Sequence, residues 1–204
     1  MRRLALLGSV LAATAALAAT VGTGTAQAGL ITGLLGGGCG TTLPVFAPWG
    51  DYATYYLAPN GTFENGSTNW SLSGGAAVVA PNNEPWYLAG LGSHALQIPR
   101  GGSASINVCY GLTYPGVRFF VAGQNGNATV HVRVVARSLL GVLSVLDGGT
   151  FTAGSGWAPS PNISTLFSAL AAPLGTKSMQ LQFTVENGTA QIDDLFVDPF
   201  LLKS

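Results

Sequence analysis

The groups that could do acid–base or metal chemistry in this chain are eight acidic side chains and two histidines. Glycoside hydrolysis needs two carboxyl groups facing each other about 5 to 9 Å apart, and no motif singles out such a pair. Serine hydrolysis needs a base and an orienting acid, but no G-x-S-x-G occurs, and His94 and His131 both stand in strand-like runs. Zinc would need clustered His and Cys. The sequence therefore predicts a protein that is not an enzyme, with a small hydrolase as a remaining alternative.

Two carboxylates are better suited to a cation. Glu64 lies in the segment Gly61–Gly66 (GTFENG), and Asp193 lies in Ile192–Val197 (IDDLFV). Calcium prefers about six to eight oxygen ligands, which carboxylates and the carbonyls of Gly- and Asn-rich loops supply. If the two segments pair, Glu64 and Asp193 would share a structural Ca²⁺ ion, and Asp194 would point to the opposite face unless the strand bulges. The alternative is that Asp193 only accepts hydrogen bonds from a turn.

Short apolar and β-branched runs carry these side chains, and Gly, Asn and Pro interrupt them about every 8 to 12 residues, as in all-β sandwiches. We predict two antiparallel sheets with about ten strands. One segment, Ile163–Leu170, fits either a short helix or a strand with an irregular tail. The predicted strands are Thr62–Asn65, Ser71–Val79, Trp86–Ala89, Ala95–Ile98, Ala104–Tyr110, Val117–Ala122, Thr129–Ala136, Val142–Val145, Met179–Val185 and Gln191–Val197.

Two of these strands alternate cleanly between apolar and polar residues. In the first, three valines share one face, and His131 and Arg133 share the other; in the second, Gln180 and Gln182 lie on the polar face. If the strands are neighbours, the four polar side chains form one surface that could bind the hydroxyl groups of a sugar. The alternative is an ordinary solvated sheet face.

Aromatic rings are the other means of binding sugars, because a flat ring packs against the apolar face of a pyranose. Trp86 and Tyr87 follow a Pro- and Asn-rich loop, and Trp157 lies in a Gly-rich loop. These three are the candidate ligand contacts, and we expect them to flank the polar sheet face. Trp70 begins an alternating strand and is predicted to be core, and Trp49 is predicted to pack the segment before the sandwich. Each loop aromatic could instead serve only as cover for the core.

The first 28 residues resemble a signal peptide. Arg2 and Arg3 precede an apolar run, and Ala26-Gln27-Ala28 supplies the small residues that signal peptidase needs, so we expect cleavage before Gly29 and a secreted protein. In an oxidising compartment the two cysteines, Cys39 and Cys109, are expected to form a disulfide.

Charge excludes one class of partner. Without Arg2 and Arg3, six basic side chains (8 minus 2) stand against eight acidic ones, a formal charge of −2. That balance gives no electrostatic attraction to nucleic acid or anionic lipid. Charged residues make up 8% of the chain, about a third of the usual share, so the surface must be polar mainly through hydroxyl and amide groups.

The end motifs together resemble carbohydrate-binding modules of the galactose-binding-like, jelly-roll type, in which an FE-x-G…W opening and an I-D-D-x-x-V closing strand lie together and often share a calcium ion. A longer set, running from Cys39 through Phe46-Ala47-Pro48-Trp49-Gly50-Asp51 and Asn83-Glu84-Pro85 to Val197-Asp198-Pro199, resembles a group of secreted bacterial proteins that carries no assigned activity. The resemblance implies a jelly-roll fold and supports secretion and the Cys39–Cys109 bridge.

These observations predict four regions: a signal peptide (1–28), an N-terminal arm tied by the disulfide (29–58), a jelly-roll β-sandwich (59–200) and a short tail (201–204). The predicted function is a secreted, non-catalytic module that binds an extracellular polysaccharide or surface glycan. A structural or adhesive protein that binds another protein is the alternative, which an exposed apolar patch would favour.

Overall fold

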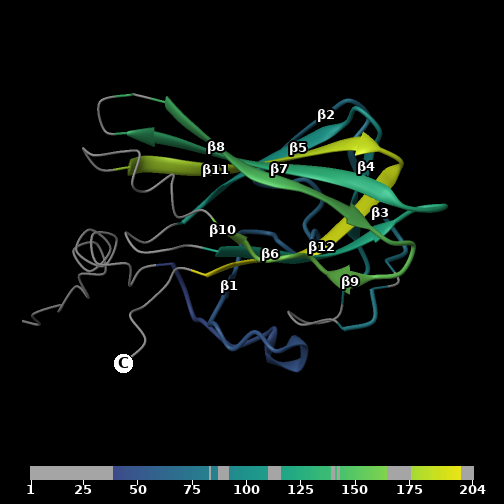
Figure 1. Cartoon of the computed structure of the whole chain (residues 1–204), viewed down its shortest axis with the longest axis horizontal. Helices are drawn as coiled ribbons and strands as arrows, with labels where there is room; N and C mark the ends of the chain where they lie inside the picture. The colour runs from purple at the N-terminus through teal and green to yellow at the C-terminus, as the bar shows by residue number, and fades with distance from the viewer. Residues whose placement is uncertain are drawn as a thin grey trace, which may run out of the picture.

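The computed structural model describes residues 39–82, 84–86, 92–109, 116–138, 141, 143–164 and 176–198. Within them, two antiparallel sheets form the two layers of a sandwich (Figure 1). The strands, in chain order, are β1 (Tyr56–Leu57), β2 (Trp70–Ser73), β3 (Ala77–Val79), β4 (Ala95–Pro99), β5 (Ser103–Val108), β6 (Gly116–Gly123), β7 (Ala128–Ser138), β8 (Leu143–Ala153), β9 (Ala158–Pro159), β10 (Ile163–Ser164), β11 (Thr176–Asn187) and β12 (Thr189–Asp198).

One sheet has seven strands in the order β10-β6-β12-β4-β3, with β1 also paired to β12 and β9 also paired to β6. The other has five strands in the order β2-β5-β11-β7-β8. This all-β, two-sheet architecture confirms the predicted β-sandwich. No helix in the described part of the chain has the length and apolar character needed to cross a membrane.

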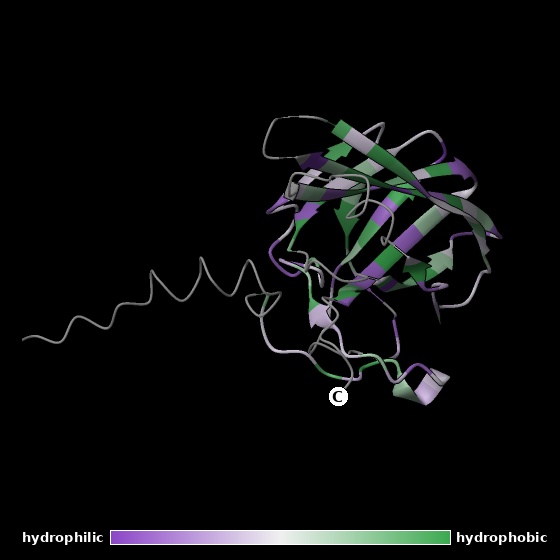
Figure 2. Cartoon of the chain, turned by 60° about the vertical axis from the view of Figure 1, so that its left-hand side comes forward, coloured by the Kyte–Doolittle hydropathy of each residue, from purple (hydrophilic) through white to green (hydrophobic). Residues whose placement is uncertain are grey.

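The core forms where the inward-facing residues of the two sheets meet. Val130, Val132 and Val134 of β7 are fully buried, as the alternation of that strand predicts, and Phe183 of β11 packs edge-to-face on Phe119 of β6 at 5.2 Å between ring centroids. Figure 2 shows the alternating polar and apolar bands along the strands. Burying apolar surface contributes about 25 cal/mol per Å², so these inner faces are the main source of stability.

Two predicted strands differ from the structure. Residues 62–65 form a turn, because Phe63 adopts a left-handed backbone (φ +58°). The predicted strand from Ser71 to Val79 is divided at Gly74 (φ +61°), where an added Cβ would lie 2.8 Å from the carbonyl oxygen of Gly101. Its two halves, β2 and β3, therefore belong to different sheets.

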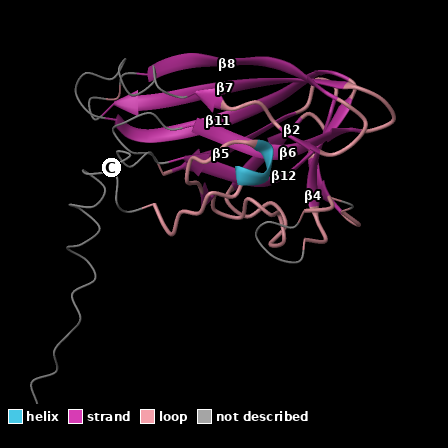
Figure 3. Cartoon of the chain, turned by 60° about the horizontal axis from the view of Figure 1, so that its bottom comes forward, coloured by secondary structure: helices cyan, strands magenta, loops and turns pink. Residues whose placement is uncertain are grey.

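A second, smaller cluster lies on the outer side of the seven-stranded sheet. Phe46 and Tyr55 of the N-terminal arm are buried against Phe120 of β6 and Phe196 of β12. The arm also carries the single-turn helix η1 (Ala47–Trp49), drawn in cyan in Figure 3. Cys39, at the start of the described chain, is bonded to Cys109, as predicted.

Several predictions fall wholly or partly on residues outside the described set: the signal peptide, the first part of the arm, the tail, Tyr87 and most of the segment Ile163–Leu170. The described part of that segment, β10, is a strand paired with β6.

Candidate functional site

The structure brings the four predicted polar contacts onto one surface. Strands β7 and β11 pair directly, with Gln182 opposite Arg133 and Thr184 opposite His131. Because Val130, Val132 and Val134 of β7 point into the core, His131, Arg133, Gln180 and Gln182 lie on the outer face of the five-stranded sheet. The condition stated from the sequence, that the two polar strands be neighbours, is met. Whether this surface binds a ligand stays a prediction.

The side chains on this face hold one another in place. Gln182 Nε2 donates a hydrogen bond of 2.8 Å to Gln180 Oε1. His131 Nε2 lies 2.8 Å from Asp147 Oδ1 of β8, and its Nδ1 lies 3.5 Å from Glu186 Oε1 of β11. Hydrogen bonds from the backbone N–H of Gly149, and then from His131, lower the pKa of Asp147. The polar groups are thus fixed on rigid strands, which reduces the entropy lost on binding.

A shallow hollow of about 270 Å³ lies on the same face, at the end remote from His131. It is lined by Asn107 of β5, by Val135 and Arg137 of β7, by Leu143 of β8, and by Ser178 and Gln180 of β11. Among the described residues of this sheet, the aromatic side chains of Trp70, Phe151 and Phe183 all pack against the core. The described part of the outer face therefore offers hydroxyl, amide and guanidinium groups but no ring of a Phe, Tyr or Trp side chain.

The predicted aromatic contacts lie elsewhere. Trp86 stacks on Phe120 of β6 (4.8 Å, 27°) and meets Trp49 edge-on (5.2 Å), and Trp157 packs against the cluster that contains Phe120. This cluster lies outside the seven-stranded sheet, whereas His131 and Arg133 lie outside the five-stranded sheet. The prediction that Trp86 and Trp157 flank the polar face is therefore wrong, because a sandwich separates the outer faces of its two sheets.

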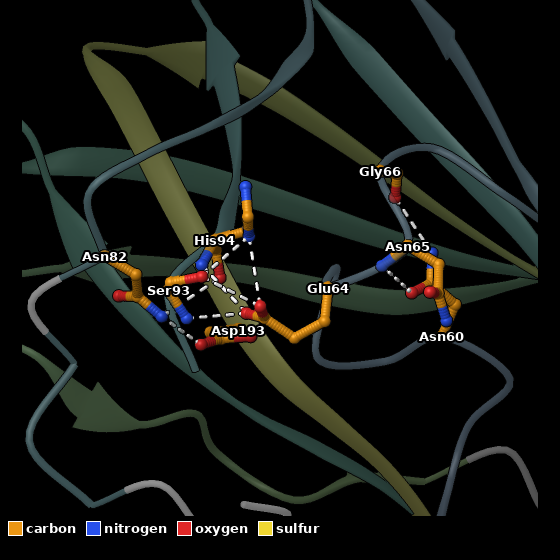
Figure 4. Close-up of polar contacts among 8 residues, drawn as sticks. All are labelled: Asn60, Glu64, Asn65, Gly66, Asn82, Ser93, His94 and Asp193. Carbon is orange, nitrogen blue, oxygen red and sulfur yellow. Dashed lines mark hydrogen bonds and ion pairs between the residues drawn. The ribbon is translucent and has the colours of Figure 1, made fainter. Parts of the chain in front are cut away.

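Glu64 makes contacts that the sequence did not reveal. Its Oε1 accepts hydrogen bonds from the backbone N–H groups of Ser93 (2.6 Å) and His94 (2.9 Å), and its Oε2 accepts from Ser93 Oγ (2.9 Å) and His94 Nδ1 (3.1 Å). Figure 4 shows the carboxylate of Glu64 pointing toward Ser93 and His94. Burial acts to raise the pKa of Glu64, but these donors outweigh it and lower the pKa to about 2.

Asp193 has different surroundings. Asn82 Nδ2 donates to Asp193 Oδ2, and the backbone N–H of Asp194 donates to Oδ1 at 2.8 Å. The strand bulges here: β12 loses register with β6 after Asp193, and Asp194 has φ +47°. Burial, followed by the charges of Asp194 and Glu84, raises the pKa of Asp193 to about 8. The bulge thus removes the simple alternation that would have sent Asp194 to the opposite face.

The fit of Glu64 and Asp193 to the predicted calcium ion is poor. A carboxylate has about four lone-pair positions, and four donors of the chain already occupy those of Glu64. The described residues also contain no group of three or more His, Cys, Asp or Glu side chains arranged to hold a metal ion. Calcium binding by Glu64 and Asp193 stays an untested prediction.

Asn82 and Glu84 are the residues here that sequence reasoning missed. Asn82 Oδ1 accepts from the backbone N–H of Glu84 (2.8 Å), and Glu84 Oε1 accepts from that of Trp86 (2.8 Å). Both side chains are buried, and Asn82 links them to Asp193. The sequence indicated only a Pro- and Asn-rich loop before Trp86. The one local signal for this role is Asn82, because Asn side chains commonly bond nearby backbone groups.

No family model matches the chain, and no curated protein matches it. Solved structures do. The CBM22-1 xylan-binding domain from Paenibacillus barcinonensis Xyn10C superposes with a TM-score of 0.52 and 17% identity over 72% of this chain and 94% of that domain. The N-terminal CBM22-1–CBM22-2 tandem domain of the same protein gives 0.51 and 16% over 72% of this chain and 44% of the tandem.

A third similar structure contains the CBM22-1 and GH10 modules of the Clostridium thermocellum endo-1,4-beta-D-xylanase 10B, complexed with xylohexaose. It superposes with a TM-score of 0.54 and 16% identity over 71% of this chain and 28% of that protein. The chain thus spans less than half of the multi-module structures and nearly all of the single module. At such identities the likeness is one of fold, and it agrees with the resemblance to carbohydrate-binding modules drawn from the end motifs.

Proposed function

We propose that the chain is a non-catalytic, extracellular module that binds a polysaccharide through the outer face of its five-stranded sheet. The observation that carries this proposal is the row of hydrogen-bonding side chains on β7 and β11, with Gln182 directly opposite Arg133 and Gln180 beside the hollow. Amides and guanidinium groups on rigid strands can match the hydroxyl pattern of a sugar chain.

Two further observations support the proposal. The similar solved structures include a domain described as xylan-binding and a protein complexed with xylohexaose. The predicted signal peptide and the Cys39–Cys109 bridge suit an extracellular location, where polysaccharides are found.

The hydrolase alternative gains no support from the acids that cluster. Glu84, Asp193 and Asp194 are 0%, 2% and 3% exposed, so their carboxyl groups do not line an open cleft in which a glycosidic bond could lie.

The alternative of a protein-binding or adhesive role rests on one specific observation. Leu143 and Val145 of β8 are 53% and 58% exposed, and β8 is the edge strand of its sheet, paired only with β7 among the described strands. An exposed apolar edge strand can pair with a strand of another protein.

The test is retention of the predicted mature chain, from Gly29 onward, on insoluble polysaccharides and in affinity gels that contain soluble ones. The double variant Gln180→Ala/Gln182→Ala should lose retention and keep its melting temperature. Gln97→Ala is the matched control, because Gln97 pairs with Gln191 in the seven-stranded sheet. Failure of the wild-type chain to bind any glycan, together with capture of a protein partner that Val145→Lys abolishes, would replace the proposal with the adhesive alternative.

A further inference from the structure

The charges on the outer face of the five-stranded sheet are unevenly distributed. At one end, His131 contacts two carboxylates, those of Asp147 and Glu186. In the middle, Arg133 lies opposite Asp147 in the register of β7 and β8, and its charge helps to lower the pKa of that carboxyl group. Both acidic side chains described on this face are therefore near His131 and Arg133.

The other end of the face has a different character. Arg137 is six residues beyond His131 in β7, which corresponds to about 20 Å of extended strand. It is exposed and lines the hollow, and the hollow has no acidic side chain among its lining residues. Within the described part of the chain, Arg137 has no ion pair, and its one hydrogen bond is a long contact of 3.5 Å from Nη1 to the carbonyl oxygen of Gly141.

The neighbours of Arg137 suit a sugar ring that carries a negative group. Asn107, Ser178 and Gln180 supply neutral donors and acceptors for hydroxyl groups, and Val135 and Leu143 supply aliphatic surface. A guanidinium group presents a planar fork of N–H donors that matches a carboxylate with two parallel hydrogen bonds. Because no Phe, Tyr or Trp ring lies among the residues that line the hollow, a neutral sugar would lack its usual stacking contact there, whereas a charged sugar would gain a charge-assisted one.

We propose that the hollow at Arg137 is a subsite for the carboxylate of a uronic acid residue, so that the polysaccharide bound by this face is an acidic one. The proposal rests on the proposed function and names its substrate class. Arg137 binds the carboxylate, Gln180 and Asn107 bind ring hydroxyl groups, and Arg133 contributes less because Asp147 lies opposite it.

The experiment compares one polymer in two charge states. The mature chain is titrated with oligomers of polygalacturonic acid and with the same oligomers after methyl esterification, which removes the charge and keeps the backbone. We expect binding to the free acid to be at least tenfold tighter and to weaken as salt is raised. Arg137→Gln should reduce affinity for the free acid about tenfold, in keeping with hydrogen bonds to charged groups, and should leave the esterified form unaffected.

Three variants make the outcome specific. Arg100→Gln, at the exposed turn between β4 and β5, changes the net charge equally and should not alter binding. Arg133→Gln should have a smaller effect than Arg137→Gln. Arg137→Lys keeps the charge but loses the fork, so it should recover only part of the affinity. Melting temperatures close to that of the wild type would show that each variant is folded.

The possible results separate this proposal from the one on which it rests. Equal binding of acidic and neutral polymers, unchanged by Arg137→Gln, would overturn the uronate subsite and leave polysaccharide binding intact. Equal affinity for a sulfated polymer would overturn the carboxylate assignment, because the hollow would then select negative charge in general and not the carboxylate group. If neither acidic nor neutral polysaccharides bind, the uronate subsite and the proposed polysaccharide binding both fail.

Discussion

The carboxylate of Glu64 accepts hydrogen bonds from both the backbone N–H and the ring Nδ1 of His94, at 2.9 and 3.1 Å. Ser93 adds two more donors, so both carboxylate oxygens accept two hydrogen bonds each. These contacts join the turn that contains Glu64 to the segment entering β4, about thirty residues away in the chain. The side chain of Glu64 therefore holds this turn against the segment that enters β4.

Replacing Glu64 with Gln should destabilise the protein. The amide keeps one acceptor oxygen, but its NH₂ group would face donors of Ser93 and His94. Hydrogen bonds to charged groups contribute about 1.5 to 3 kcal/mol each, and partial exposure reduces this, so we expect a loss of about 1 to 2 kcal/mol in the free energy of unfolding. Urea unfolding measures it. Glu186→Gln, at an exposed carboxylate, is the control, and an equal effect from both variants would contradict the role of Glu64.

Metal removal gives a second prediction. Hydrogen-bond donors of the chain already occupy the acceptor positions of the Glu64 carboxylate. We therefore expect neither added Ca²⁺ nor a chelator to change the melting temperature of the wild-type protein. The calcium ion predicted from the sequence requires the opposite result: chelation lowers the melting temperature, and Asp193→Ala removes that sensitivity. Differential scanning calorimetry of both proteins, with and without chelator, distinguishes the two cases.

The buried carboxyl group of Asp193 should make stability depend on pH. Burial and the neighbouring carboxylates raise its pKa from the ordinary 3.8 to about 8 in the folded state. Between these two pH values the folded protein holds a proton that the unfolded chain has lost, so this group's contribution to stability falls as pH rises from about 4 to 8 and changes no further outside that range.

The measurement is the free energy of unfolding at several pH values from 4 to 9, with Asp193→Asn as the test variant. The free energy of unfolding of this variant should change less with pH over this range than that of the wild type, even if the overall stability of the two proteins differs. Asp147→Asn is the control, because the pKa of that exposed carboxyl group is lowered and cannot produce this slope. If both variants keep the wild-type slope, Asp193 is not the group responsible.

The strand faces could be predicted from the sequence because alternation is a local signal. Val130, Val132 and Val134 of β7 repeat every second residue, as do the glutamines of β11, so burial of the apolar set fixes the exposure of the polar one. The pairing of β7 with β11 could be stated from the sequence only as a condition. Nothing in a strand's own residues identifies a partner strand about fifty residues away. The disulfide was predictable because only two cysteines were available.

The turn at Glu64 and the bulge at Asp194 could not be predicted in this way. Both depend on left-handed backbone at non-glycine residues, Phe63 and Asp194, which tertiary contacts stabilise against local preference. The burial of Glu84 is similarly non-local, because it follows from the link through Asn82 to Asp193, more than one hundred residues away. Loop aromatics were assigned to the wrong sheet because a loop's composition does not show which layer it covers.

The tryptophans should divide into two groups when each is replaced by alanine. Trp70 is buried against Phe63 and Phe183, and its Nε1 donates to the carbonyl oxygen of Asn60 at 3.1 Å. Trp70→Ala should therefore cost about 3 to 5 kcal/mol in the free energy of unfolding. Trp86 is 36% exposed and stacks mainly on Phe120, so Trp86→Ala should cost less, about 1 to 2 kcal/mol.

Polysaccharide binding by the same variants tests which side of the sandwich carries the site. Trp86 and Trp157 lie outside the seven-stranded sheet, so their replacement should leave the affinity of the five-stranded face unchanged while Gln180→Ala reduces it. The measurement is isothermal titration with the polymer retained by the wild type, beside a melting curve for each variant. A loss of affinity in Trp86→Ala, with Gln180→Ala unaffected, would move the binding site to the seven-stranded side. Aromatic stacking would then replace the polar face as its physical basis.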